Sequence, residues 1–163
     1  MYSKLLKTHK KQFGQFLTPR SLSKKLINNI NFNIDSKVLE PSFGDGSFID
    51  NILEKFLPLY HHSLSIEQKL DFIFARNIFG VESDRKLFSK CLNNIRHKYG
   101  YLPKKHNLCN DNFFLYNPNF KFDFIVGNPP FGGSIDKGIQ DKLDKRFGYR
   151  YGMKIKKETY SFL

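Results

Sequence analysis

Residues 37–48 read Lys-Val-Leu-Glu-Pro-Ser-Phe-Gly-Asp-Gly-Ser-Phe. The short apolar run at 37–40 is cut off by Pro41 and Gly44, and apolar side chains then recur at helical spacing as far as Leu57. This order predicts a strand, a glycine loop and a helix. Such a unit is typical of α/β proteins that bind a ligand at the loop.

The alternation continues along the chain. Apolar periodicity predicts helices at about 20–30, 65–76 and 87–95, and strands at 78–82, 106–110 and 122–126. Strands that alternate with helices form a parallel, doubly wound sheet, so we expect an α/β fold of the Rossmann-like kind. Ligands of such sheets bind at the carboxyl ends of the strands. The polar residues expected to converge there are Glu40, Glu82, Asp111 and Asn128.

Composition favours a polyanionic partner. The chain has 163 residues, enough for one domain, and a formal charge of +12 from 27 Lys and Arg against 15 Asp and Glu. An AT-rich genome would also inflate lysine, so charge alone leaves nucleic acid binding as one of two readings. No apolar run reaches the roughly 18 residues of a membrane span, and the N-terminus lacks a signal peptide, so we expect a cytoplasmic protein.

The two cysteines, Cys91 and Cys109, form no CxxC pair and have no nearby histidine pattern. We therefore expect reduced core cysteines and no metal site.

Acidic residues near the strand ends suit a cofactor that carries positive charge. The glycine loop lacks the third glycine of a dinucleotide site, since position 49 is Ile49, which argues against a pyrophosphate. Glu40 and Asp45 could instead supply negative charge to an ammonium or sulfonium group. Glu82 could accept both hydroxyls of a ribose.

Asp111 could accept the exocyclic amine of a cofactor adenine. The run 110–114 leaves the register open by one residue, so Asn112 and Phe113 are placed in the cofactor site with it.

The sequence Asn128-Pro129-Pro130-Phe131 is the most specific signal in the chain. An aromatic amine is a poor nucleophile, but the Asn128 side chain and the Pro129 carbonyl can each accept one of its hydrogens and orient its lone pair. The two prolines, Pro129 and Pro130, restrict the backbone and remove competing N–H donors. Phe131 offers a ring on which an extruded base could stack. We expect these four residues to form the catalytic loop of a nitrogen methyltransferase.

Together these segments resemble the amino-methyltransferases of DNA restriction-modification systems, in the gamma-type order. The resemblance rests on residues 13–19, which read Phe-Gly-Gln-Phe-Leu-Thr-Pro, and on the stretches 39–48, 80–84 and 126–131. It implies S-adenosylmethionine as cofactor, with Thr18, Glu40, Gly44 and Gly46 around its methionine portion, Glu82 at the ribose and Asp111 at the adenine amine. The full expected cofactor site comprises Phe16, Thr18, Pro19, Glu40, Pro41, Gly44, Asp45, Gly46, Glu82, Asp111, Asn112 and Phe113.

The activity that the resemblance implies is methyl transfer from S-adenosylmethionine to the N6 amino group of adenine in DNA. A protein glutamine methyltransferase acting on release factors is the main alternative, because an amide nitrogen poses the same chemical problem. The segment 13–19 favours the DNA group, since it does not resemble the protein-modifying one. An RNA base methyltransferase and a catalytically silent nucleic-acid-binding fragment are further alternatives.

The chain divides into three expected parts. Residues 1–34 form a basic arm and cofactor-motif helix, 35–131 the S-adenosylmethionine-binding catalytic core, and 132–163 a mobile loop and the start of another helix. Family members of this kind have seven strands, whereas only four can be placed here. We therefore expect an incomplete sheet with its fourth strand at an edge, no target-recognition domain, and a need for a second chain or a missing C-terminal region.

Overall fold

The computed structural model describes residues 17–128, together with 137–138, 141–142, 145, 149–150 and 153–154. Residues 17–128 form one compact unit, and the segments on either side belong to another. In the latter unit, β5 (Tyr149–Arg150) pairs antiparallel with β6 (Met153–Lys154). The helices and strands described below all belong to residues 17–128.

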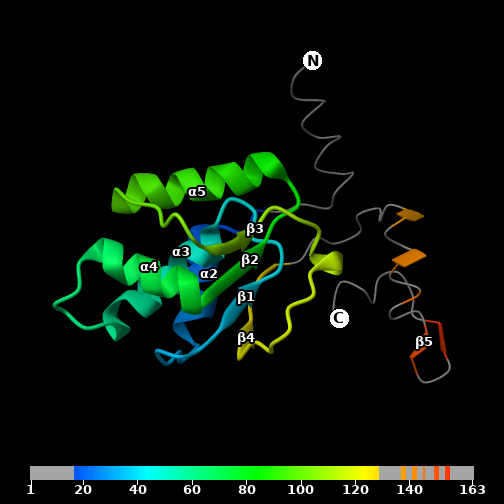
Figure 1. The fold of residues 1–163 in the computed structure, drawn as a ribbon, viewed down its shortest axis with the longest axis horizontal. Coiled ribbons are helices and arrows are strands. Elements are labelled where there is room, and N and C mark those ends of the chain that lie inside the picture. The colour runs from blue at the N-terminus through cyan, green and yellow to red at the C-terminus, as the bar shows by residue number, and fades with distance from the viewer. Residues whose placement is uncertain are drawn as a thin grey trace, which may run out of the picture. The chain divides into compact units, whose positions relative to one another are not determined.

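A four-stranded parallel sheet forms the centre of this unit, in the order β3-β2-β1-β4 (Figure 1). Its strands are β1 (Val38–Glu40), β2 (Ile78–Val81), β3 (Asn107–Cys109) and β4 (Phe124–Ile125). The expected parallel α/β sheet is confirmed, and β4 lies at an edge as expected. From β1 the chain continues to β2 and β3 on one side of the sheet, whereas β4 lies on the other side of β1. Ligands of such sheets bind at the point where the strand order changes direction in this way.

The β4 strand is shorter than the expected 122–126 for a physical reason. The N–H groups of Asp123 and Phe124 both donate to the Lys37 carbonyl, at 2.9 and 3.2 Å, whereas the Lys37 N–H donates to the Asp123 side chain at 2.7 Å, so the regular ladder is interrupted here. The ring of Phe122 packs against the ring of Phe79, and the two ring centroids are 5.3 Å apart. Regular pairing therefore starts at Phe124.

The helices lie close to their expected positions. They are α2 (Arg20–Asn28), α3 (Ser47–Phe56), η1 (Leu57–Leu59), α4 (Ile66–Arg76), α5 (Arg85–Tyr99) and η2 (Phe113–Leu115). The α5 helix is longer than the expected 87–95 because Asp84 caps it, accepting the N–H groups of Lys86 and Leu87. It ends at Gly100, whose φ of +70° is left-handed.

The main hydrophobic cluster lies on one face of the sheet. Strand register places Val38, Ile78 and Phe124 on the same face, and all three pack in the cluster with the helices. The opposite face carries Leu39 and Ile125, and Ile125 is 65% exposed at the sheet edge. Within the described residues, no helix has the length and apolar character needed to cross a membrane.

A buried asparagine joins β2 to the loop before β1. Asn77 is fully buried, and its amide nitrogen donates to the carbonyls of Ile34 at 2.7 Å and Ser36 at 3.0 Å. Its side-chain oxygen accepts the Tyr60 hydroxyl at 2.7 Å. One side chain therefore satisfies three polar groups beneath the sheet.

Replacing Asn77 with Ala should lower the free energy of unfolding by about 2–4 kcal/mol, because buried partners lose their hydrogen bonds. Tyr60→Phe, which removes only one of these bonds, should cost about 1 kcal/mol. Urea unfolding followed by circular dichroism measures both. Equal losses for the two variants would contradict the assigned role of Asn77.

Candidate functional site

The glycine loop between β1 and α3 is held in a fixed shape by the neighbouring strand and helix. Phe43 donates its N–H to the Val81 carbonyl at 3.2 Å, and Gly44 and Gly46 have left-handed φ angles of +57° and +92°. A Cβ at Gly46 would lie 2.5 Å from the sulfur of Cys91 on α5. The loop therefore requires glycine for its backbone shape and for its contact with α5.

Glu82 lies at the carboxyl end of β2 and connects that strand to the glycine loop. One carboxylate oxygen accepts the N–H of Gly44 at 2.7 Å, and the other accepts the N–H of Asp84 at 2.8 Å. Glu82 is 4% exposed, and burial raises the pKa of its carboxyl above the usual value despite these bonds. The expected ribose acid therefore lies directly beneath the expected cofactor loop.

Glu40 lies at the end of the neighbouring strand β1 and is buried, with 1% exposure. Its Oε1 accepts the N–H of Ser42 at 3.1 Å. Burial raises the pKa of this carboxyl to about 8, and the charge of nearby Glu82 acts in the same direction. Burial therefore favours the protonated form of Glu40, and its expected place beside the cofactor stays a prediction.

Asp45, whose place in the cofactor site stays a prediction, makes contacts with two helices. Its Oδ2 lies 3.1 Å from the ammonium nitrogen of Lys90 on α5, and its Oδ1 accepts the Ser47 hydroxyl at 3.2 Å. Asn94 donates to its backbone carbonyl. The Asp45 carboxylate therefore serves to bind the loop to α5 and α3, and its charge is already compensated.

The segment before α2 lies against the glycine loop. A Cβ on Gly44 would stand 3.0 Å from the Leu17 side chain, so residues from the expected N-terminal motif and from the loop are in contact. Thr18 is half-buried, and Pro19 forms the N-terminal cap of α2. Pro41 is half-buried within the loop itself. Phe16 lies outside the described residues.

The end of β3 joins the same edge of the sheet. Asn110 donates its side-chain N–H to the carbonyl of Glu82 at 2.6 Å, and Asn112 caps η2 by accepting the N–H of Phe114. Asp111, between them, is exposed, and one of its oxygens accepts the N–H of Asn112. Phe113 is half-buried in η2.

Asn128 follows β4 and is half-buried, and it is the last residue of the compact unit. Pro129, Pro130 and Phe131 lie outside the described residues. Gly127, just before it, lies against Glu40: a Cβ built there would stand 2.8 Å from the Glu40 carboxyl carbon. The strand ends that carry Glu40, Glu82 and Asn128 thus meet at one edge of the sheet.

Sequence reasoning missed Ser42. Its hydroxyl is buried and has no hydrogen-bond partner among the described residues, which is uncommon for a buried hydroxyl. A serine inside a loop enriched in glycine gives no distinctive pattern, and only its position between Glu40 and Gly44 could have drawn attention to it.

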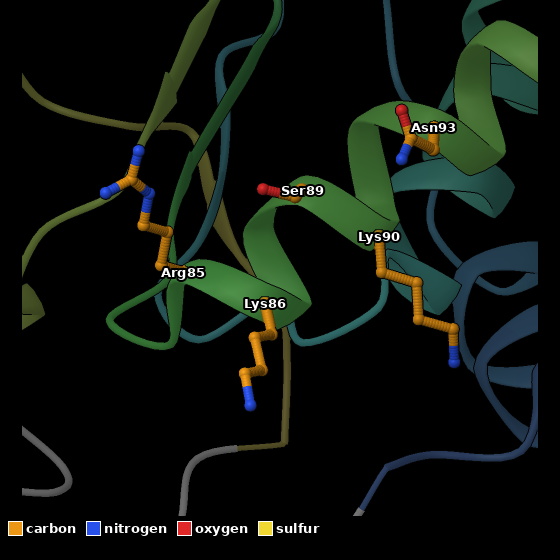
Figure 2. Close-up of a pocket in the computed structure, with 5 residues that line it drawn as sticks. All are labelled: Arg85, Lys86, Ser89, Lys90 and Asn93. Carbon is orange, nitrogen blue, oxygen red and sulfur yellow. The ribbon is translucent and has the colours of Figure 1, made fainter.

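A shallow basic groove lies along the first turns of α5, close to the glycine loop. Its lining combines three cations with two small polar side chains, and Figure 2 shows Lys86 and Lys90 extending to one side of the helix and Arg85 to the other. The lining residues are Arg85, Lys86, Ser89, Lys90 and Asn93. Lys90 pairs with Asp45, whereas Arg85 and Lys86 are exposed and form no ion pair within residues 17–128.

Comparison with known proteins agrees with this arrangement. The methylase subunit of the type I restriction enzyme EcoEI from Escherichia coli is 25% identical over 134 residues, covering 78% of this chain and 25% of that protein. The modification methylase CviBIII of Paramecium bursaria Chlorella virus NC1A is 32% identical over 134 residues, covering 78% and 28%. The chain thus spans about a quarter of the length of these curated relatives.

A solved structure supports the fold. The modification subunit of a putative type I restriction enzyme from Vibrio vulnificus YJ016 superposes with a TM-score of 0.64 at 21% identity, over 99% of this chain and 32% of that one. The sequence profile of the N-6 DNA Methylase family matches residues 1–163. The resemblance drawn from the sequence motifs is confirmed: this chain belongs to the N-6 DNA Methylase family.

Proposed function

We propose that this chain carries the cofactor-binding and catalytic part of an S-adenosylmethionine-dependent methyltransferase that modifies the N6 amino group of adenine in DNA. The observation that carries this proposal is the convergence of Glu40, Glu82 and Asn128 at the switch point of a parallel sheet. Membership of the N-6 DNA Methylase family supports it independently.

The residues present fit S-adenosylmethionine. Each oxygen of Glu82 accepts one backbone N–H and retains a lone pair for a ribose hydroxyl. The Ser42 hydroxyl, which is buried without a partner in the described part of the chain, suits a polar group of a ligand at the loop. A solved putative methyltransferase, SMU.472, was crystallised with S-adenosylhomocysteine, and it shares this fold with a TM-score of 0.52 at 16% identity.

The adenine end of the cofactor is proposed to lie at Asp111. The amide of Asn110 is used to bind the β2 end, and the Asn112 side chain caps η2. Asp111 is the exposed acceptor between them, which supports its assignment to the cofactor amine. Phe113, in the half-buried turn that follows, could pack against the ring.

In the proposed mechanism, the Asn128 side-chain oxygen and the Pro129 carbonyl accept the two hydrogens of the target amine. These bonds hold the nitrogen with its lone pair directed at the methyl carbon. The bound cofactor supplies that methyl group on a sulfonium centre. As the nitrogen–methyl bond formed, the methyl–sulfur bond would break and release the cofactor as a neutral thioether, and the amine proton would pass to water. Phe131 would stack on the extruded adenine.

DNA as the partner is supported by the charge of the chain and by its distribution. The formal charge is +12, and the groove on α5 is lined by three cations and no carboxylate. Since the matched region covers only 25% and 28% of the curated relatives, we propose that target recognition comes from another region or chain.

Asn128→Ala should lower methyl transfer to DNA by roughly 100-fold or more, because the amine loses an acceptor that orients it. The assay supplies labelled S-adenosylmethionine with unmethylated DNA, RNA or release factor, and identifies the product as N6-methyladenine. Asn29→Ala, an exposed asparagine at the end of α2, is the matched control and should keep wild-type activity.

Label found only in a protein glutamine would replace the DNA assignment with the amide one. Cofactor binding without any transfer would mean that this chain alone is catalytically silent.

Neutralising the groove with Arg85→Gln and Lys86→Gln should weaken binding to duplex DNA and reduce the slope of log K against log salt by about 2, one unit per lost phosphate contact. Fluorescence anisotropy at several salt concentrations measures both quantities. The control neutralises Lys104 and Lys105, exposed just before the amino end of β3, and should leave the slope unchanged. An equal effect of both pairs would show that only net charge matters.

A further inference from the structure

We propose that Glu40 is a positioning residue: its buried carboxyl is the surface against which Gly127 packs, and it thereby sets the backbone that presents Asn128 beside the glycine loop. The sequence predicted that Glu40 contacts the cofactor. Here its side chain is assigned contacts with Ser42 and Gly127 instead. The catalytic consequence rests on the function proposed above.

The geometry around Glu40 joins two loops through one side chain. Its Oε1 accepts the N–H of Ser42, in the glycine loop, at 3.1 Å. The same carboxyl lies against Gly127, where a Cβ would stand 2.8 Å from the carboxyl carbon, 3.0 Å from Oε2 and closer still to Oε1. A single buried group therefore contacts the segment that precedes Gly44 and the residue that precedes Asn128.

Backbone shape does not require a glycine at position 127. The described glycines with left-handed φ are Gly44, Gly46 and Gly100, and Gly127 is not among them. An alanine could adopt a negative φ, and the three atoms nearest to its Cβ would all belong to the Glu40 carboxyl. The glycine directly before the Asn-Pro-Pro-Phe sequence is thus explained by a residue 87 positions earlier in the chain.

The pairing of β1 with β4 restricts the movement of Gly127 relative to Glu40. The N–H of Val126 donates to the carbonyl of Leu39 at 2.9 Å, so the residues preceding Gly127 and Glu40 are joined by a ladder bond. The pairing of β1 with β4 ends at that bond, and the next contact between the two segments is the packing of Gly127 against Glu40. Glu40 is 1% exposed, so a carboxyl displaced by a new Cβ would have to leave the buried position that it occupies.

The test is a double-mutant cycle on the full 163-residue chain with Gly127→Ala, Glu40→Asp and the combination. Glu40→Asp shortens the side chain by one methylene group and makes space for the new Cβ. The measurements are the urea midpoint, the hydrogen-exchange rate of the Asn128 amide by nuclear magnetic resonance, and kcat and KM for methyl transfer.

Gly127→Ala should lower the urea midpoint and speed exchange at Asn128 at least tenfold, and the added Glu40→Asp should recover at least half of each change. The kcat for methyl transfer should fall in Gly127→Ala and recover in the double variant, and the KM of Gly127→Ala for S-adenosylmethionine should stay within threefold of wild type. If Gly127→Ala does not fold alone, recovery of folding in the double variant supports the contact. Additive losses, or a double variant no better than Gly127→Ala, overturn the proposal.

The two proposals fail separately. A wild-type chain that transfers no methyl group to any substrate removes the proposed function, but the midpoint and the exchange rate still decide whether Glu40 positions Asn128. Conversely, an active enzyme with additive variants retains the function and loses the inference.

Discussion

The parallel pairing of β1 with a strand on each side is the constraint on which the site depends. β1 has only three residues, yet it pairs with β2 along one edge and with β4 along the other. Because parallel strands all end at the same edge of a sheet, this arrangement places residues 40, 82 and 128 together although they are distant in sequence. Shifting either register by one residue would turn Glu40 or Asn128 away from the others.

The polar groups of the site are largely engaged with one another. Glu82 holds Gly44, Glu40 holds Ser42, and the Asp45 carboxylate is paired with Lys90. These bonds fix the loop before any ligand arrives, so little of the binding free energy is needed to order it. Burial around the loop also raises the pKa values of the Glu40 and Glu82 carboxyls, which favours the neutral form of each.

Periodicity in the sequence was enough to place the helices and the four strands of the sheet, because the apolar patterns of residues 37–126 are strong. It was also enough to name the strand ends where Glu40, Glu82 and Asn128 lie. Contacts between distant residues could not be read in this way. The pairing of Asp45 with Lys90 depends on how α5 packs, and the late start of β4 depends on a bond that the Lys37 N–H donates to the Asp123 carboxylate.

Burial was the other quantity that the pattern left open. A glutamate after a short apolar run is equally consistent with an exposed carboxylate and with a buried one, and only the structure shows that Glu40 is buried and lies against Gly127. The orphaned hydroxyl of Ser42 depends likewise on what surrounds it. The roles of Pro129, Pro130 and Phe131 remain predictions from the sequence.

The thiol of Cys91 packs against Gly46, so its reactivity can report on opening of the glycine loop. Its side chain is fully buried against the loop, and burial raises the pKa of its thiol well above the ordinary range, so the reactive thiolate is almost absent. Cys109, at the end of β3, is only half-buried and is also a free thiol. Alkylation at Cys91 therefore requires α5 to separate from the glycine loop, and its rate relative to Cys109 records how often the loop opens.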